Sequence, residues 1–300
     1  MKNFLRKVII KIVNFIDSKL FWIKCDYFFK GKINLNIYNL HSTRPKDFNY
    51  YKKILKYIDK RSKFINPQDI ENLSTTNFKN SNYSILTFDD GYRDNHEFAL
   101  TILKELNIKA IFFIIPKFIH EKNKFSEEYL NKLYPEKRYE INAERKLIFQ
   151  HMNYSQINNL LMEGHQIGIH GFEHEDYGKI KLMQIKKKIN QSKNILEKFN
   201  IRTNHFAYPF GSSKNFSNDS NKILSKYFRF IYTGVRGINS LSNIRSYKSY
   251  IFKRQTLSTH KEDLVYFPIK LEEVYFFSFN KIIKFIYMLI RIFSQKKYEE

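Results

Sequence analysis

The chain has 300 residues, of which 43% are hydrophobic and 27% charged, a balance that excludes disordered and collagen-like classes and permits one large domain with a buried core. Its 52 Lys and Arg against 29 Asp and Glu give a formal net charge of +23, which predicts attraction to polyanions such as nucleic acid, an anionic membrane surface or an acidic polysaccharide without indicating which one. Genome base composition could also produce this excess of Lys without any selected partner. We expect no nucleic-acid partner, because no nucleic-acid-binding motif accompanies the charge. The single cysteine, Cys25, excludes an internal disulfide.

Both ends of the chain predict basic amphipathic helices, in residues 1–29 and 269–300. Apolar residues recur there at helical spacing, interrupted by Lys and Arg. No uncharged run in residues 1–29 is long enough to span a membrane, and no signal-peptide cleavage site follows. We therefore expect a cytoplasmic protein. Two interpretations remain open: the terminal helices pack on the domain, or they lie at the inner face of an anionic membrane.

Between these ends, residues 30–268 predict one domain in which strands and helices alternate. We expect strands at 33–40, 84–88, 110–115, 165–169, 205–208, 228–232 and 252–257, and helices at 50–57, 67–73, 95–106, 156–163 and 183–199. The polar stretch 117–150 is expected to be an insertion outside the core. Strands separated by helices indicate a parallel sheet, and their number favours closure into a distorted (β/α) barrel.

Three of the predicted strands end in groups that could carry chemistry. They are followed by Asp89-Asp90-Gly91, by His170 with His174 four residues on, and by Tyr208-Pro209-Phe210-Gly211. In parallel barrels the active site lies at the carboxyl ends of the strands. An Asp-Asp-Gly alone is more typical of a helix cap and turn, and two histidines four residues apart are, alone, more often two surface histidines. Together, two imidazoles and a carboxylate form a set suited to Zn²⁺ or another divalent metal.

These motifs, in this order, resemble those of the NodB-homology polysaccharide deacetylases, over roughly residues 34–257. The resemblance includes the flanking segment Tyr38-Asn39-Leu40-His41. It implies that Asp90, His170 and His174 bind a divalent metal, most simply Zn²⁺, and that Asp89 is the general base. It further implies that an N-acetylated glycan is the substrate. The expected substrate contacts are Tyr92, Tyr208, Pro209, Phe210 and Gly211, with a backbone N–H near Phe210 stabilising the oxyanion.

The sequence departs from the family pattern at three places. Ala207 stands where an Arg usually steadies the base, and we expect Arg254, at the end of a late strand, to replace it. Gly171 stands where Ser or Thr is usual, which removes one possible hydrogen bond. The usual Leu-His motif that supplies the general acid is not evident, so His260 is the candidate from a loose match. His165 and His205 begin their strands and are expected to be structural.

The sequence therefore predicts a metal-dependent hydrolase that removes N-acetyl groups from the amino sugars of a polysaccharide or lipid-linked glycan. One alternative is a catalytically impaired member that binds glycan without turning it over. A second is a metal amidase that acts on an amide outside sugars.

Overall fold

The computed structural model describes residues 34–72, 82–119, 127, 129–130, 149–240 and 249–257. They belong to one unit, Asn34–Leu257. The predicted terminal helices, His260 and most of the stretch 117–150 lie outside the described residues.

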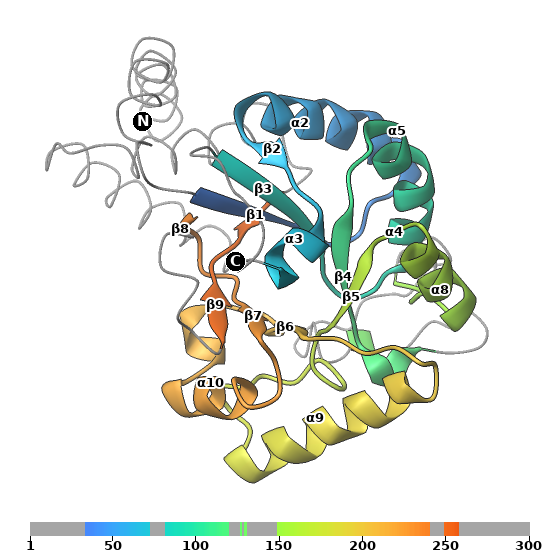
Figure 1. Cartoon of the computed structure of the whole chain (residues 1–300). Coiled ribbons are helices and arrows are strands. Elements are labelled where there is room, and N and C mark those ends of the chain that lie inside the picture. The colour runs from blue at the N-terminus through green and yellow to red at the C-terminus, as the bar shows by residue number, and fades with distance from the viewer. Residues whose placement is uncertain are drawn as a thin grey trace, which may run out of the picture. The chain divides into compact units, whose positions relative to one another are not determined.

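A predominantly parallel sheet forms the centre of this unit (Figure 1). The strand order is β10-β1-β3-β4-β5-β6-β7-β9. The strands span β1 (Asn34–Leu40), β3 (Asn82–Phe88), β4 (Ala110–Ile114), β5 (Gln166–Ile169), β6 (His205–Ala207), β7 (Phe230–Tyr232), β9 (Tyr250–Phe252) and β10 (Gln255–Thr256). Short β2 (Lys63–Phe64) pairs parallel with β3, and β8 (Asn239–Ser240) pairs antiparallel with β1. Most positions of β1, β3, β4, β5, β6 and β7 are buried and most of their residues are apolar, as is typical of parallel strands covered on both faces.

The two strands at the ends of this sheet order, β9 and β10, follow one another directly in the sequence. We predicted one strand over 252–257, but the structure divides this region. Strand β9 pairs with β7 through Tyr232 and Phe252, whereas β10 pairs with β1 through Tyr38 and Gln255. Only the residues between Phe252 and Gln255 separate β9 from β10, so the sheet curls round on itself. The predicted (β/α) barrel is confirmed, and the break in the last strand is where the curled sheet returns to β1.

Most helices surround the sheet on its outside, whereas α3 lies in the middle of the ring of strands in this view (Figure 1). They span α2 (Phe48–Arg61), α3 (Pro67–Glu71), α4 (Arg93–Phe98), α5 (Lys104–Leu106), α8 (Tyr154–Met162), α9 (Leu182–Glu197) and α10 (Asn218–Leu224), with a π-helical turn at Ala99–Leu103 between α4 and α5. Short 3₁₀ turns lie at Pro45–Asp47, Pro116–Phe118 and Ser213–Asn215. Helix α10 was not predicted, although Ser217 supplies a recognisable N-cap by accepting a hydrogen bond from the N–H of Ser220. No helix among the described residues is long and apolar enough to cross a membrane.

The amino ends of the strands hold the two histidines that we expected to be structural. The Nδ1 atom of His165 accepts a hydrogen bond from the N–H of Ala110. The side chain of His205 is buried between the Tyr232 hydroxyl, 2.9 Å from Nδ1, and the Glu71 carboxylate on α3, 2.9 Å from Nε2. Both imidazoles are therefore occupied by contacts that hold strands and helix together.

The stretch 117–150 contributes to the core, contrary to the prediction. Phe118, Tyr129 and Leu130 are buried, and Tyr129 packs with Tyr92, Ile115 and Phe118 in one apolar cluster. The weak hydrophobic periodicity of this stretch hid these residues, because isolated buried aromatics in an irregular segment leave no helical or strand period.

Candidate active site

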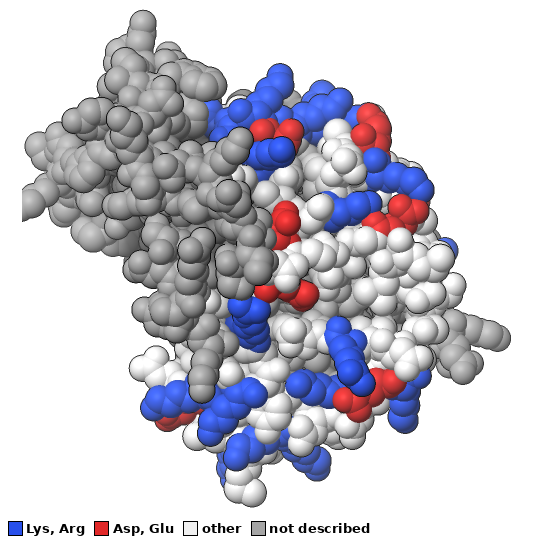
Figure 2. Space-filling model, viewed as in Figure 1, with Lys and Arg blue, Asp and Glu red and all other residues white. Residues whose placement is uncertain are grey.

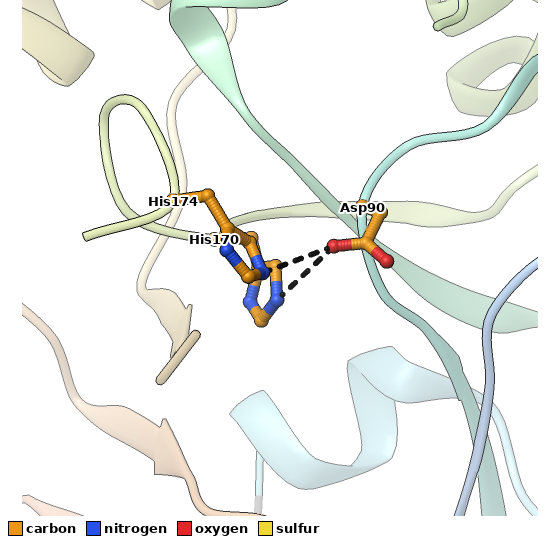
Figure 3. Close-up of side chains that lie close together, drawn as sticks. All are labelled: Asp90, His170 and His174. Atoms are coloured by element: carbon orange, nitrogen blue, oxygen red, sulfur yellow. Dashed lines mark ion pairs between the residues drawn. The ribbon is translucent and has the colours of Figure 1, made fainter. Parts of the chain in front are cut away.

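The carboxyl ends of β3 and β5 bring Asp90, His170 and His174 together (Figure 3). The Oδ1 atom of Asp90 lies 3.5 Å from Nε2 of His170 and 3.4 Å from Nε2 of His174. One ligand atom from each residue lies within 4.8 Å of the other two, and all three side chains are buried. The structure therefore gathers the three residues that the sequence proposed as metal ligands.

This donor set fits a divalent metal. Nδ1 of His170 lies 3.0 Å from the Ala207 carbonyl oxygen, so it carries the proton and leaves Nε2 free to bind a metal. The Oδ1 atom of Asp90 is buried without a hydrogen-bond partner, which is costly unless an ion satisfies it. Burial lowers the pKa of His170 to about 4, so its imidazole is neutral at pH 7, the form that binds metal.

Backbone strain is concentrated at this site. Among described residues other than glycine, five have positive φ, and two of these are asparagines, which tolerate that conformation. The other three are Asp90 (φ 73°), His174 (φ 64°) and Phe210 (φ 61°). Left-handed backbone at such residues persists only where the surroundings impose it, and it clusters at functional sites. The fold thus holds a ligand from each of two strands in a conformation that the isolated chain disfavours.

Asp89, beside the ligand Asp90, is held by a cation from the far end of the sheet. Arg254 donates from Nη1 to Oδ1 of Asp89 at 2.7 Å and from Nη2 to Oδ2 at 2.8 Å. The amide of Asn39 at the end of β1 donates to the same Oδ2 at 2.9 Å, and its oxygen accepts from Arg254 and from Thr87. Arg254 therefore makes the contact with Asp89 that we expected it to make in place of the arginine missing at position 207.

The charges around Asp89 keep it ionised. Burial alone raises the pKa of its carboxyl, but Arg254, His170 and His41 outweigh burial and lower that pKa below its usual value. Oδ2 of Asp89 lies 4.0 Å from Nε2 of His170, on the metal-ligand side. A carboxylate that stays charged next to a metal position can take a proton from a water molecule there.

Of the five predicted substrate contacts, only Phe210 is exposed, with 47% of its surface accessible. Its ring centroid lies 4.5 Å from that of His174, so it lines the open side of the metal site. Tyr92 is buried, with its hydroxyl oxygen 2.6 Å from that of Tyr129. Tyr208 is buried, and its hydroxyl donates to Asn221 at 2.7 Å, so it belongs to the core.

Pro209 and Gly211 are buried and shape the loop that presents Phe210. Gly211 has φ +63°, and a Cβ there would lie 2.5 Å from the backbone N of Gly234. Only glycine fits this close approach of two loops.

His41 is a titratable residue at this site that sequence reasoning did not assign a role. It is exposed, directly follows β1, and lowers the pKa of both Asp89 and Asp90 when protonated. Asn95 holds the backbone beside it, donating to the His41 carbonyl oxygen at 2.7 Å. The sequence signal that could have identified it is its position, because His41 follows the carboxyl end of a predicted strand two residues after Asn39. His260 lies outside the described residues.

A family model described as polysaccharide deacetylase matches residues 77–227, half of the chain. Among curated proteins, the chain is 30% identical over 124 residues to YxkH of Bacillus subtilis (strain 168), whose name proposes a polysaccharide deacetylase. That match covers 39% of this chain and 43% of the relative, so less than half of the relative's length is compared.

Solved structures show the same fold. IcaB from Ammonifex degensii matches with a TM-score of 0.57 and 16% identity, covering 78% of this chain and 97% of that one. The deacetylase PplD of Streptococcus pyogenes, solved with acetate, matches with a TM-score of 0.56 and 18% identity, covering 79% of this chain and 96% of that one. At these identities the likeness establishes the barrel fold, and the arrangement of side chains must carry the chemistry.

Proposed function

Because the chain belongs to the polysaccharide deacetylase family, we propose that it is a metal-dependent hydrolase that removes the N-acetyl group from amino sugars of a polysaccharide or lipid-linked glycan. One observation carries the proposal. A buried carboxylate held by Arg254 stands beside a buried Asp-His-His set that can bind a divalent metal. This pairing of a base with a metal position is what hydrolysis of an unreactive amide needs.

Asp90, His170 and His174 would hold the metal, and we propose Zn²⁺ from the two imidazoles and one carboxylate. A bound Zn²⁺ would polarise the acetamide carbonyl and acidify water. The chain's own contribution is positional. Arg254 and Asn39 fix both carboxylate oxygens of Asp89, so the base is ionised and oriented before substrate arrives.

The second half of the reaction needs a proton on the amine that leaves. Among the described residues, we propose His41 for this role. His41 is exposed, and its charge lowers the pKa of both Asp89 and Asp90. An imidazole can act as a general acid and donate a proton to a departing nitrogen. His41→Gln should lower kcat by ~100-fold or more. An unchanged kcat in His41→Gln would exclude His41 as the donor.

The central test is acetate release from an N-acetylglucosamine-containing glycan. Asp89→Asn removes the base, and His170→Ala removes a ligand, so each should abolish release. Asp219→Asn, which alters an exposed carboxylate paired with Lys222, is the matched control and should retain full activity. Full activity in both site variants would refute the mechanism.

We also propose that the enzyme works at an anionic membrane surface, where a lipid-linked glycan would be presented. Figure 2 shows Lys and Arg side chains gathered along the lower edge of this face, over α9 and α10. At the start of α9, Leu182 (44% exposed) and Met183 (85% exposed) lie between exposed Lys181 and Lys186. Exposed apolar side chains flanked by lysines suit a bilayer interface, which offers both acyl chains and anionic headgroups.

Co-sedimentation with vesicles tests this location. Binding to phosphatidylserine vesicles at low salt should exceed binding to neutral vesicles, and Leu182→Ser with Met183→Ser should weaken it. Equal, negligible recovery with both vesicle types would refute a membrane location and leave the hydrolytic proposal intact.

The alternative of a catalytically impaired glycan-binding member drew on the missing arginine at Ala207 and on the unidentified general acid. The bidentate contact of Arg254 with Asp89 removes the first of these two motives. Activity that is lost on chelation and returns with Zn²⁺ would distinguish an enzyme from a binding protein.

A further inference from the structure

The loop that carries the two histidine ligands contains a glycine whose missing side chain is replaced by another residue. Gly171 follows His170 directly and has φ +69°. A Cβ placed on Gly171 would lie 2.6 Å from Oε2 of Glu175 and 3.0 Å from Cγ of Pro209. The carboxylate of Glu175 therefore occupies the space beside Gly171, inside the turn that connects His170 to His174.

Glu175 binds the backbone of this turn from within. Its Oε2 accepts a hydrogen bond from the N–H of Phe172 at 2.9 Å, and its Oε1 accepts from the N–H of Glu173 at 3.2 Å. Glu175 is buried, with 8% of the residue's surface exposed. Hydrogen bonds from backbone N–H groups to a carboxylate are among the stronger ones in proteins. Each of these bonds fixes a peptide that lies between the two histidines.

A lysine on α9 anchors the same turn from outside. Nζ of Lys188 lies 3.7 Å from Oε1 of Glu175, forms an ion pair with Glu173 and lies 5.0 Å from the ring centroid of Phe172. Glu173 is also paired with Lys117 at 2.6 Å. The turn is thus tied to a long helix by a cation that contacts three of its residues.

We propose that Glu175 is a positioning residue for the metal ligand His174, and that Lys188 supports it. This inference rests on the metal centre of the proposed function. His174 has φ 64°, a backbone conformation that a β-carbon disfavours and that the surroundings must maintain. By fixing the peptides of Phe172 and Glu173, Glu175 sets where the strained residue directs its imidazole. Removing a group that hydrogen-bonds a metal ligand directly weakens metal binding ~10–100-fold, and Glu175, which acts through the backbone, should lie near the lower end of that range.

Glu175→Gln is the decisive variant. It keeps size and shape but converts one oxygen into an NH₂ group, which must face a backbone N–H instead of accepting from it. We expect the dissociation constant for Zn²⁺, measured by competition with a chromophoric chelator, to rise ~10-fold. Lys188→Met should raise it by less, and Lys187→Met on the exposed neighbouring position should leave it unchanged. Glu97→Gln, at an exposed glutamate on α4, is the control for the glutamate change.

Hydrogen exchange of the metal-free protein provides a readout that does not depend on metal. The amides of Phe172 and Glu173 should exchange faster in Glu175→Gln than in the wild type, while amides of β4 remain protected. Wild-type Zn²⁺ affinity and wild-type exchange in Glu175→Gln would together overturn the assignment. If the wild type bound no Zn²⁺, the metal centre itself would be refuted. If Glu175→Gln failed to fold, Lys188→Met would carry both measurements, and wild-type values there would overturn the role of Lys188.

Discussion

Replacing Arg254 with Met is the perturbation whose effect the structure defines best. Arg254 and Asp89 are 1% and 3% exposed, and they share two hydrogen bonds of 2.7 and 2.8 Å. Removing one partner of a buried ion pair costs ~3–5 kcal/mol, because the other charge is left buried and unpaired. Two charge-assisted hydrogen bonds at ~1.5–3 kcal/mol each give a similar figure. We expect Arg254→Met to lower the free energy of unfolding by about 4 kcal/mol.

A double-mutant cycle isolates the pair from packing. If the unpaired charge causes the loss, Asp89→Asn should recover ~2 kcal/mol or more when added to Arg254→Met, because it removes the buried charge. The measurement is urea unfolding followed by circular dichroism, with a chelator present so that metal binding does not contribute. Arg202→Met, at an exposed arginine, should change stability by less than ~0.5 kcal/mol.

Two results would refute this reasoning. One is a loss of less than ~1 kcal/mol in Arg254→Met, which would mean that water or another cation replaces the guanidinium. The other is strict additivity in the cycle, which would assign the cost to packing. Activity provides a third check. Without Arg254 the pKa of Asp89 must rise, so the acid limb of kcat/KM should move to higher pH.

Three further predictions follow from buried contacts. Burial lowers the pKa of His165 from 6.5 to about 4, so the unfolded chain takes up a proton at this residue at a higher pH than the folded chain does. Stability should therefore fall by up to about 3 kcal/mol as pH drops from 6.5 to 4. His165→Asn keeps an acceptor for the Ala110 N–H and should flatten that fall in urea unfolding. Gly168→Ala would bring a Cβ to 2.3 Å from the Phe113 ring and should cost ~1–3 kcal/mol, which Phe113→Leu in the same chain should partly restore. Zn²⁺ at 100 times its dissociation constant should stabilise the wild type by about 2.7 kcal/mol in thermal melts, and His174→Ala should abolish that shift.

The sequence was most informative where function requires a short contiguous motif. The ligand set and Asp89 lie within two such motifs, and the alternation of strands and helices predicted the barrel. Contacts between distant segments were harder to derive. Arg254 could be nominated only because Ala207 lacked the usual group, whereas Asn39 and the buried Tyr129 gave no signal of their own. The role of Glu175 depends on the absence of a side chain at Gly171, which becomes visible only in three dimensions.

The break between β9 and β10 links closure of the sheet to preparation of the base. At this break, the backbone N–H of Arg254 donates to the Val235 carbonyl oxygen at 3.0 Å, and its Nε donates to the Thr233 carbonyl oxygen at 2.9 Å. The same side chain reaches Asp89, which follows β3, and Asn39, the last residue but one of β1. The cation is therefore fixed only when the segment after β7 has returned to β1. Because Asp89 is buried, its ionised form is stable only in that closed arrangement. Substitutions that loosen the closure should therefore raise the pKa of the base and lower stability together, even where they touch neither Asp89 nor a metal ligand.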